Sequence, residues 1–116
     1  MLNLPDVERN ITIESRQIDG YGYLNNGSYA QIFEYERFAY QKNVPLTSIM
    51  KGLIFGNRPF LRHLTIEYID QTYEGDVVTV RTFAQDREVD LLFKQEMLRG
   101  EENLSARCES VYCASS

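Results

Sequence analysis

Apolar and polar residues alternate along five short stretches of this chain, a pattern typical of strands with one buried face. One stretch, 11–16, precedes a single helical segment, and four follow it at 63–68, 77–85, 89–97 and 104–112. Clean alternation is typical of antiparallel strands, and connections of about four residues indicate hairpins. The pattern therefore predicts a strand, a long helix and then four strands in a meander.

The segment from Ser28 to Lys42 has helical spacing, and the first proline after it is Pro45. Asn25, Asn26 or Ser28 is expected to cap its start. At about 100° per residue, most apolar side chains fall on one side of the helix and most polar ones on the other. The expected apolar stripe is Tyr29, Ile32, Phe33, Tyr35, Ala39 and Tyr40, and the expected polar side is Gln31, Glu34, Arg37, Gln41 and Lys42.

One helix and five strands predict an α+β fold, in which a five-stranded curled antiparallel sheet wraps around the helix and buries its apolar stripe. Glu36 breaks that stripe, because it projects among its apolar side chains. A buried carboxylate must be paired, protonated or hydrated. We therefore expect Glu36 to be buried beside a basic or hydroxyl side chain.

Length and charge exclude several classes of protein. A chain of 116 residues with 43% hydrophobic and 25% charged residues is expected to form one globular domain, 1–116. Its net charge of −5, from 12 Lys and Arg against 17 Asp and Glu, argues against a nucleic-acid binder. No apolar run approaches the roughly 20 residues of a membrane span, and residues 1–6 lack the features of a secretion signal. We therefore expect a cytoplasmic protein.

Few residues are available for metal or thiol chemistry. The chain has one histidine, His63, and two cysteines, Cys108 and Cys113, too few for a four-ligand zinc site, so no metal is expected. An odd separation along a strand points the cysteines to opposite faces, and both are expected to be free thiols. His63 alternates with apolar neighbours, which predicts a position on the sheet face away from the helix. An enzyme of this sequence is then expected to use a carboxylate.

A glycine-rich turn, Asp19-Gly20-Tyr21-Gly22, places a carboxylate directly before the expected helix. The start of a helix has unpaired N–H groups and the positive end of the helix dipole, which together polarise a carbonyl group. The arrangement suits hydrolysis. Asp-Gly is also a common turn pair, so an ordinary turn is the alternative on these residues alone.

The same turn belongs to a longer motif. Residues 16–29, followed by Phe33-Glu34 and Arg37, resemble the signature of hot-dog-fold acyl thioesterases, in particular the 4-hydroxybenzoyl-CoA thioesterase-like family. That signature runs D-x-x-G-x-x-N-N-x-x-Y, with E-x-x-R in the helix. The later strands are similar to those of the family at Thr65-Ile66-Glu67-Tyr68, Gly75-Asp76 and Ala106-Arg107. The resemblance covers nearly the whole chain and implies the hot-dog fold.

The resemblance implies an acyl thioester hydrolase that needs no cofactor. Asp19 matches the catalytic carboxylate of the family, which acts as a nucleophile or as a general base on water. Asn26 matches the helix start, whose backbone N–H binds the thioester carbonyl. Gly22, Tyr23 and Tyr29 are expected to contact the substrate.

Three departures from the family concern the site and the carrier of the acyl group. Tyr23 replaces a histidine and Gln17 an aspartate of many relatives, and neither change touches the expected base. The hairpin 86–90 holds three acids around one base, where relatives that use coenzyme A often carry basic residues for its phosphates. Like charges disfavour phosphate binding, which favours an acyl carrier protein over coenzyme A. Arg58 and Arg62 are the expected contacts for a phosphate or a carrier.

The family places its active site between subunits, so a homodimer or homotetramer is expected, with Asp19 facing residues 58–62 of a partner. Aromatic side chains near 53–55 are expected to form core or to line an acyl pocket. Two alternatives share the fold. The first is a non-catalytic module that binds an acyl thioester or small effector and does not need Asp19. The second is a hydratase or dehydratase, which needs a histidine in the active site, whereas His63 is expected to lie away from that site.

Overall fold

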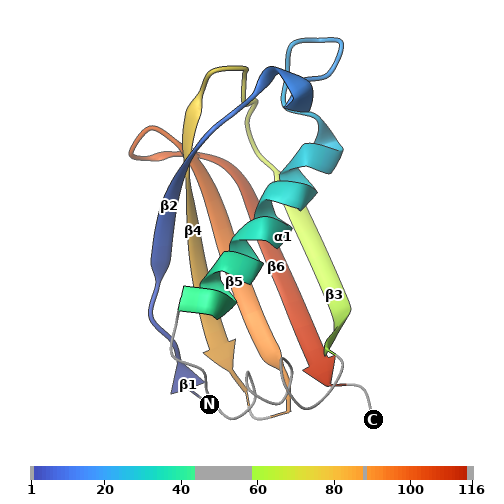
Figure 1. The fold of residues 1–116 in the computed structure, drawn as a ribbon, viewed down its shortest axis with the longest axis vertical. Helices are drawn as coiled ribbons and strands as arrows, with labels where there is room; N and C mark the ends of the chain where they lie inside the picture. The colour runs from blue at the N-terminus through green and yellow to red at the C-terminus, as the bar shows by residue number, and fades with distance from the viewer. Residues whose placement is uncertain (1, 44–58, 88, 115–116) are drawn as a thin grey trace.

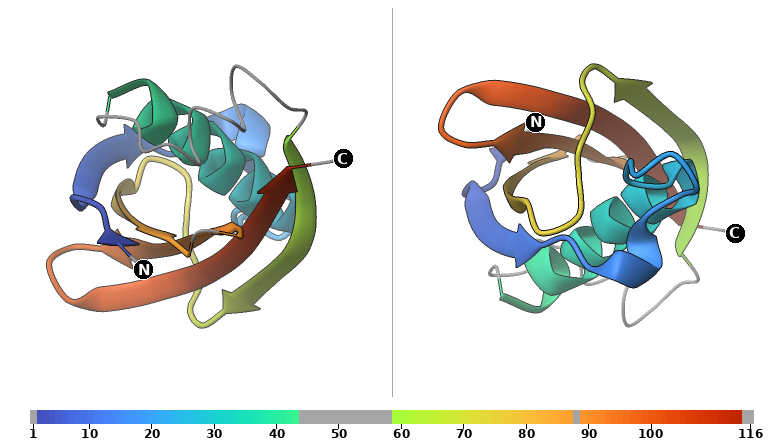
Figure 2. Two further views of the ribbon diagram at one scale, coloured as in Figure 1. Left: turned by 90° about the horizontal axis from the view of Figure 1, so that it is seen from below. Right: turned by 90° about the horizontal axis from the view of Figure 1, so that it is seen from above.

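The computed structural model describes residues 2–43, 59–87 and 89–114. In this part of the chain one antiparallel sheet curls around a single long helix (Figures 1 and 2), which confirms the expected α+β architecture. In chain order the elements are β1 (Leu2–Asn3), β2 (Val7–Thr12), the 3₁₀ turn η1 (Ser15–Gln17), α1 (Asn26–Asn43), β3 (Pro59–Tyr68), β4 (Val77–Asp86), β5 (Leu91–Arg99) and β6 (Asn103–Ala114).

The order of the strands corrects one prediction. The strands β4, β5 and β6 form a meander, but β3 pairs with β6 at the far edge of the sheet and not with β4. The reason is that β4 has β5 on one side, and on the other side it has β2 and the two-residue β1. The connection 69–76 is therefore no hairpin. It crosses the end of the sheet, where Ile13 exchanges backbone hydrogen bonds with Gly75 and Asp76, each 2.9 Å long.

The first long strand lies earlier than the alternation predicts. It ends at Thr12, and Ser15–Gln17 forms a 3₁₀ turn instead of continuing the strand. The Gln17 side chain closes this turn, because its Oε1 accepts a hydrogen bond from the Glu14 N–H at 2.8 Å. Ile13 still reaches the core and is only 1% exposed.

The buried side of α1 confirms most of the predicted stripe and corrects two positions. The confirmed core residues are Tyr29, Ile32, Phe33 and Tyr40. Tyr35 is 62% exposed, whereas Arg37, expected on the polar side, is 3% exposed. The rotation per residue explains both corrections. Arg37 follows Phe33 by four residues, which is about 40° around the helix, while Tyr35 lies about 160° from Phe33.

Arg37 is a polar part of the core between α1 and the sheet. Its Nη1 donates to Gln95 Oε1 at 3.0 Å, and its Nε donates to the Tyr112 hydroxyl at 3.0 Å. Gln95 in turn donates to the backbone carbonyl of Phe33 at 2.9 Å. Through these bonds Arg37 ties the middle of the helix to β5 and β6.

Glu36 is buried beside a basic partner, as predicted. It is 3% exposed, and its Oε2 lies 3.2 Å from Nε of Arg9 on β2. Its Oε1 has no hydrogen-bond partner among the described residues. Burial raises the pKa of the Glu36 carboxyl above its usual value, and the positive charge of Arg9 opposes that rise.

The cysteines Cys108 and Cys113 are both buried free thiols, as predicted. Within the described residues, no helix combines the length and the apolar character that crossing a membrane requires.

Candidate active site

The Asp19 carboxylate holds its own turn together. Its Oδ1 accepts hydrogen bonds from the N–H groups of Tyr21 at 2.8 Å and Tyr23 at 3.1 Å. Gly22 has a φ of 87°, in the left-handed region that glycine adopts without strain. With Oδ1 engaged by the backbone, Oδ2 accepts no hydrogen bond from the described part of the chain. The turn therefore fixes a carboxylate and leaves one of its oxygens available.

The turn leads directly into α1, whose cap is Asn25. The Asn25 carbonyl accepts hydrogen bonds from Ser28 at 2.9 Å and Tyr29 at 3.3 Å, and its side-chain Oδ1 accepts one from Gly27 at 2.8 Å. The first N–H groups of a helix have no partner within the helix. These bonds leave the N–H of Asn26 without an acceptor among the described residues.

Tyr23 and Tyr29 lie at the same end of the molecule. Tyr23 is half-buried and pairs with Tyr73 in the connection 69–76, with their ring centroids 5.6 Å apart. Tyr29 is almost fully buried, and its ring centroid lies 5.2 Å from that of Tyr68 at the end of β3. The Asp19 turn, the start of α1 and the end of β3 therefore meet at one end of the sheet (Figure 1).

Two hydroxyl groups that the sequence does not point to, those of Thr72 and Ser105, form hydrogen bonds at the Asp19 end of the sheet. Thr72 is fully buried, and its Oγ1 bonds both the Tyr29 hydroxyl, at 3.3 Å, and the Ser105 hydroxyl. Ser105 also donates to the backbone carbonyl of Asp70 at 3.2 Å. No periodic signal marks these residues, because Thr72 lies in a connection and Ser105 lies next to a shift in the β5–β6 register.

Arg62 lies toward the opposite end of β3. Its Nη2 is 2.8 Å from Asp90 Oδ2, and Nε of Arg87 is 2.6 Å from Asp90 Oδ1. The hydrogen bond from Arg87, with that from Arg62, holds the pKa of the Asp90 carboxyl below its usual value. Arg62 precedes Tyr68 by six residues, about 20 Å along a strand, so one chain does not bring it to Asp19. Arg58 lies outside the described residues.

The remaining candidates are placed as follows. His63 lies on the outer face of the sheet, away from α1 as predicted, with its Nε2 2.8 Å from Thr65 Oγ1. The aromatic segment 53–55 lies outside the described residues. Among the residues that are described, no group of three His, Cys, Asp or Glu side chains is placed to hold a metal ion. The chemistry available at the Asp19 end is therefore that of a carboxylate beside a helix N–H.

The sequence matches no protein-family model and no curated protein, whereas the structure matches solved structures. A predicted thioesterase from Bacillus stearothermophilus is 24% identical, with a TM-score of 0.78 over 97% of this chain and 81% of that one. The 4-hydroxybenzoyl CoA thioesterase from Pseudomonas sp. strain CBS-3 is 13% identical, with a TM-score of 0.77 over 94% and 84%. A 1,4-dihydroxy-2-naphthoyl-CoA thioesterase from Synechocystis is 16% identical, with a TM-score of 0.74 over 94% and 81%.

At identities this low, the structural matches establish the fold alone. The chemistry has to be argued from the residues of the site. The likeness extends over more than nine tenths of this chain in all three cases, so it concerns the architecture as a whole. The resemblance seen in the sequence is thereby confirmed for the architecture: this chain has the hot-dog fold of the thioesterases that it resembles.

Proposed function

We propose that this protein hydrolyses acyl thioesters and that Asp19 is its catalytic carboxylate. The observation that carries the proposal is that two groups, the Asp19 carboxylate and the Asn26 N–H, lie at the same end of the molecule. Asp19 presents Oδ2 while the backbone holds Oδ1, and the N–H of Asn26 at the start of α1 has no acceptor within the described chain. A carboxylate and a free helix N–H are the two parts that attack on a thioester carbonyl requires.

In this proposal the thioester carbonyl oxygen accepts a hydrogen bond from the Asn26 N–H. Asp19 then acts in one of two ways. As a general base it takes a proton from water, whose oxygen attacks the carbonyl carbon; as a nucleophile it attacks that carbon itself, and water later cleaves the anhydride. In either case negative charge develops on the carbonyl oxygen, where the helix N–H and dipole stabilise it. The C–S bond breaks, and the leaving thiolate takes a proton: from the Asp19 carboxyl when Asp19 acts as the base, or from water when Asp19 acts as the nucleophile.

Part of the negative charge of the 86–90 hairpin is balanced within the chain, which weakens the argument from that charge for an acyl carrier protein over coenzyme A. Asp90 is neutralised by Arg62 and Arg87 and is only 5% exposed, so it presents little free negative charge to a phosphate. Two of the three similar structures are named as thioesterases of aromatic acyl-CoA substrates. We therefore include both acyl-CoA and acyl-carrier-protein thioesters among the proposed substrates, with aromatic acyl groups in the first set to be tested.

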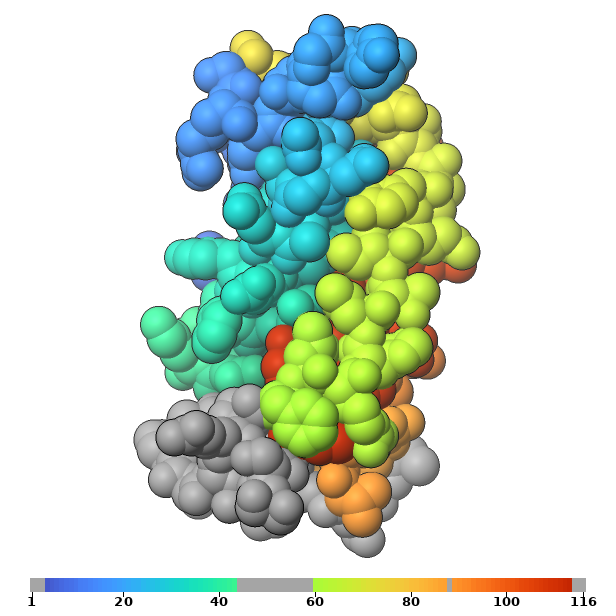
Figure 3. Space-filling view, turned by 90° about the vertical axis from the view of Figure 1, so that its right-hand side faces the viewer, coloured from blue at the N-terminus to red at the C-terminus, as the bar shows by residue number. Residues whose placement is uncertain are grey.

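The site is proposed to be completed by a second copy of the chain. The β3 edge of the sheet lies open beside α1 (Figure 3), and Leu64 and Tyr68 on this strand are 43% and 49% exposed. An open strand edge pairs readily with another strand. Antiparallel pairing of two β3 strands brings Arg62 of one copy toward the Asp19 end of the other, a placement that a single chain does not achieve. Sedimentation of a stable monomer at micromolar concentration would contradict this pairing.

The experiment is a hydrolysis screen of the purified wild-type protein. Aryl-CoA, fatty acyl-CoA and acyl-carrier-protein thioesters are each incubated with the protein, and the released thiol is measured with a chromogenic thiol reagent. We expect release from at least one set at a rate well above that of buffer alone. Binding of a thioester without release would instead support the non-catalytic module. Neither binding nor release from any thioester would overturn the proposed function.

A further inference from the structure

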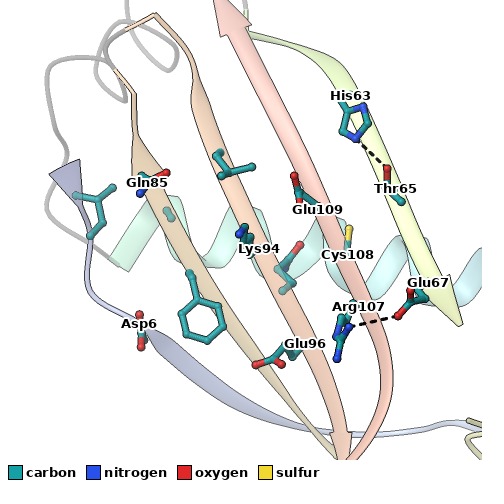
Figure 4. A pocket seen from close by; sticks show the side chains of 15 residues that line it. Asp6, His63, Thr65, Glu67, Gln85, Lys94, Glu96, Arg107, Cys108 and Glu109 are labelled. Atoms are coloured by element: carbon teal, nitrogen blue, oxygen red, sulfur yellow. Dashed lines mark hydrogen bonds and ion pairs between the residues drawn. The ribbon is translucent and has the colours of Figure 1, made fainter. Parts of the chain in front are cut away.

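Polar side chains gather in two parts of this molecule, with very different exposure. The outer face of the sheet, which points away from α1, carries a hollow of about 800 Å³ whose charged side chains, such as Glu67 and Arg107, are exposed (Figure 4). At the Asp19 end, by contrast, the hydroxyl-bearing residues Tyr29, Thr72 and Ser105 are almost fully buried. A buried hydroxyl group costs free energy unless it is hydrogen-bonded, so this second group needs a structural reason.

The three buried hydroxyl groups form one chain of hydrogen bonds that ends on the backbone. Ser105 donates to the carbonyl of Asp70 at 3.2 Å. Because each hydroxyl group has one proton to donate, Thr72 then donates to Ser105, and Tyr29 donates to Thr72 at 3.3 Å. All three protons are thereby used inside the protein. Tyr29 can offer a substrate its ring but not its hydroxyl proton.

A bulge in β6 aims Ser105 at this chain of hydrogen bonds. The β5–β6 register shifts between Met97 and Leu98, so Ser105 is the extra residue between Leu104 and Ala106. In a regular strand successive side chains point to opposite faces, whereas here Ser105 and Ala106 are both buried. A bulge re-aims a side chain in this way, and bulges are frequent beside active sites.

Thr72 contacts both parts of the proposed site. Its backbone carbonyl accepts a hydrogen bond at 2.7 Å from the N–H of Leu24, which follows the Asp19 turn. Its hydroxyl group accepts the hydrogen bond from Tyr29, which lies three residues after Asn26 in the first turn of α1. The turn supplies the carboxylate, and the start of the helix supplies the N–H. Thr72 therefore links the position of one to the position of the other.

Given the proposed function, on which this inference rests, we propose that Thr72 is a positioning residue of the thioesterase. Its hydroxyl group holds the start of α1 at the distance from the Asp19 turn that the reaction needs. Thr72 does not touch the reacting atoms, because its hydroxyl group is buried and bonded inside the protein on both sides. It acts through geometry, to which rates are sensitive: a misplacement of about 1 Å costs up to about a hundredfold.

The experiment compares variants of two buried threonines. Thr72→Val removes the hydroxyl group but keeps the shape of the side chain and the backbone carbonyl, and Thr72→Ser keeps the hydroxyl group. Thr82→Val is the matched control, because Thr82 is also buried and its hydroxyl group accepts a hydrogen bond from Gln95 at 3.3 Å, on β4 within the sheet. The kcat and KM for the best thioester are measured together with urea unfolding.

We expect Thr72→Val to lower kcat at least about tenfold and to change KM less than about threefold, because the groups that bind the substrate are retained. Thr72→Ser is expected to keep kcat within about threefold of the wild type. Thr82→Val is expected to unfold at a lower urea concentration and still keep its kcat. In the Asp19→Asn background, Thr72→Val is expected to lower the residual rate less than about threefold, because the charge that it positions is already absent.

A second measurement does not depend on hydrolysis. Two-dimensional ¹H–¹⁵N NMR spectra report the surroundings of the Asn26 N–H and of the Tyr23 N–H, which bonds Asp19. We expect Thr72→Val to shift both resonances and Thr82→Val to leave both in place.

Should Thr72→Val fail to fold, Ser105→Ala takes its place. It removes the acceptor of the Thr72 proton and leaves Thr72 itself intact. The same two resonances are expected to shift, and kcat is expected to fall at least about threefold.

Three results would overturn the proposal. They are a folded Thr72→Val or Ser105→Ala variant with the kcat and the two resonances of the wild type, a Thr72→Ser variant as slow as Thr72→Val, and a Thr82→Val variant that loses as much kcat as Thr72→Val. A wild type that hydrolyses no thioester contradicts the proposed function instead. The NMR comparison then still decides whether Thr72 holds the start of α1 against the Asp19 turn, and unshifted resonances would overturn that too.

Discussion

Two polar regions of this protein are held in place in opposite ways. The Asp19 carboxylate contacts backbone N–H groups only two and four residues away, in a turn at one end of the molecule. Arg37, in contrast, contacts side chains 58 and 75 residues away, in the middle of the core. A group held by its immediate neighbours can be changed without disturbing the sheet, whereas a group that joins three elements cannot. The comparison separates a candidate catalytic residue from a structural one.

The largest effect on stability is expected from Arg37→Met. This change leaves Gln95 Oε1 and the Tyr112 hydroxyl without their donor inside the core, and each unsatisfied buried group costs about 1–3 kcal/mol. We expect the free energy of unfolding, measured with urea, to fall by about 3 kcal/mol. The control is Arg16→Met, because Arg16 is exposed near the Asp19 turn. Equal stability of the two variants would contradict a structural role for Arg37.

A smaller effect on stability, but a clear one on activity, is expected from Gly22→Ala. The φ of 87° is strained for alanine by about 1–2 kcal/mol, and part of that strain is relieved if the turn shifts. Because the same turn positions Asp19, thioester hydrolysis is expected to fall about tenfold while unfolding shifts by about 1 kcal/mol. Gly20→Ala is the matched control, since no positive φ is recorded there and its Cβ meets open space. Loss of activity in both variants would argue against the turn geometry as the cause.

The smallest expected effect is a pH dependence at Glu36. Because burial raises the pKa of this carboxyl, the folded chain binds its proton more tightly than the unfolded chain does. The stabilisation from that proton is present below the usual carboxyl pKa of 4.5 and is lost as pH rises through the raised value. The wild type should therefore lose stability relative to Glu36→Gln as pH rises from 4 to 8.

Urea unfolding of both proteins at several pH values measures this difference, with Glu34→Gln, exposed on the same helix, as the control. A difference that is constant with pH would show that Glu36 titrates alike in both states. Hydrolysis is expected to survive Glu36→Gln in the folded protein, and its loss there would move the catalytic carboxylate from Asp19 to Glu36.

The sequence predicts the locally determined parts of the molecule best. The strand alternation, the helix and the position of His63 follow from periodicity, and the burial of Glu36 follows from its place in the apolar stripe. The place of β3 could not be predicted in this way, because it depends on β2 already occupying the edge of β4. The burial of Arg37 could have been predicted from its angular position on the helix, four residues after Phe33. Its charge favoured the polar side instead, and the prediction was wrong. The hydrogen bond between Thr72 and Ser105 could not be predicted, because the two residues are far apart in the sequence and meet only in the folded chain.

The central claim is that the negative charge of Asp19 is needed for thioester hydrolysis and not for folding. In the structure Oδ1 makes the hydrogen bonds of the turn, and an asparagine retains that oxygen while it loses the negative charge. Asp19→Asn should therefore keep the wild-type fold and stability. Asp70→Asn, which changes an exposed aspartate that likewise accepts a nearby backbone N–H, is the matched control.

The most direct measurement is the rate of thioester hydrolysis by wild type, Asp19→Asn and Asp70→Asn, with urea unfolding of the same preparations. We expect Asp19→Asn to unfold like the wild type and to hydrolyse the best substrate at least about a hundredfold more slowly, the usual contribution of a positioned base. Asp70→Asn is expected to match the wild type in both measurements. An Asp19→Asn variant that is folded and fully active would contradict the account.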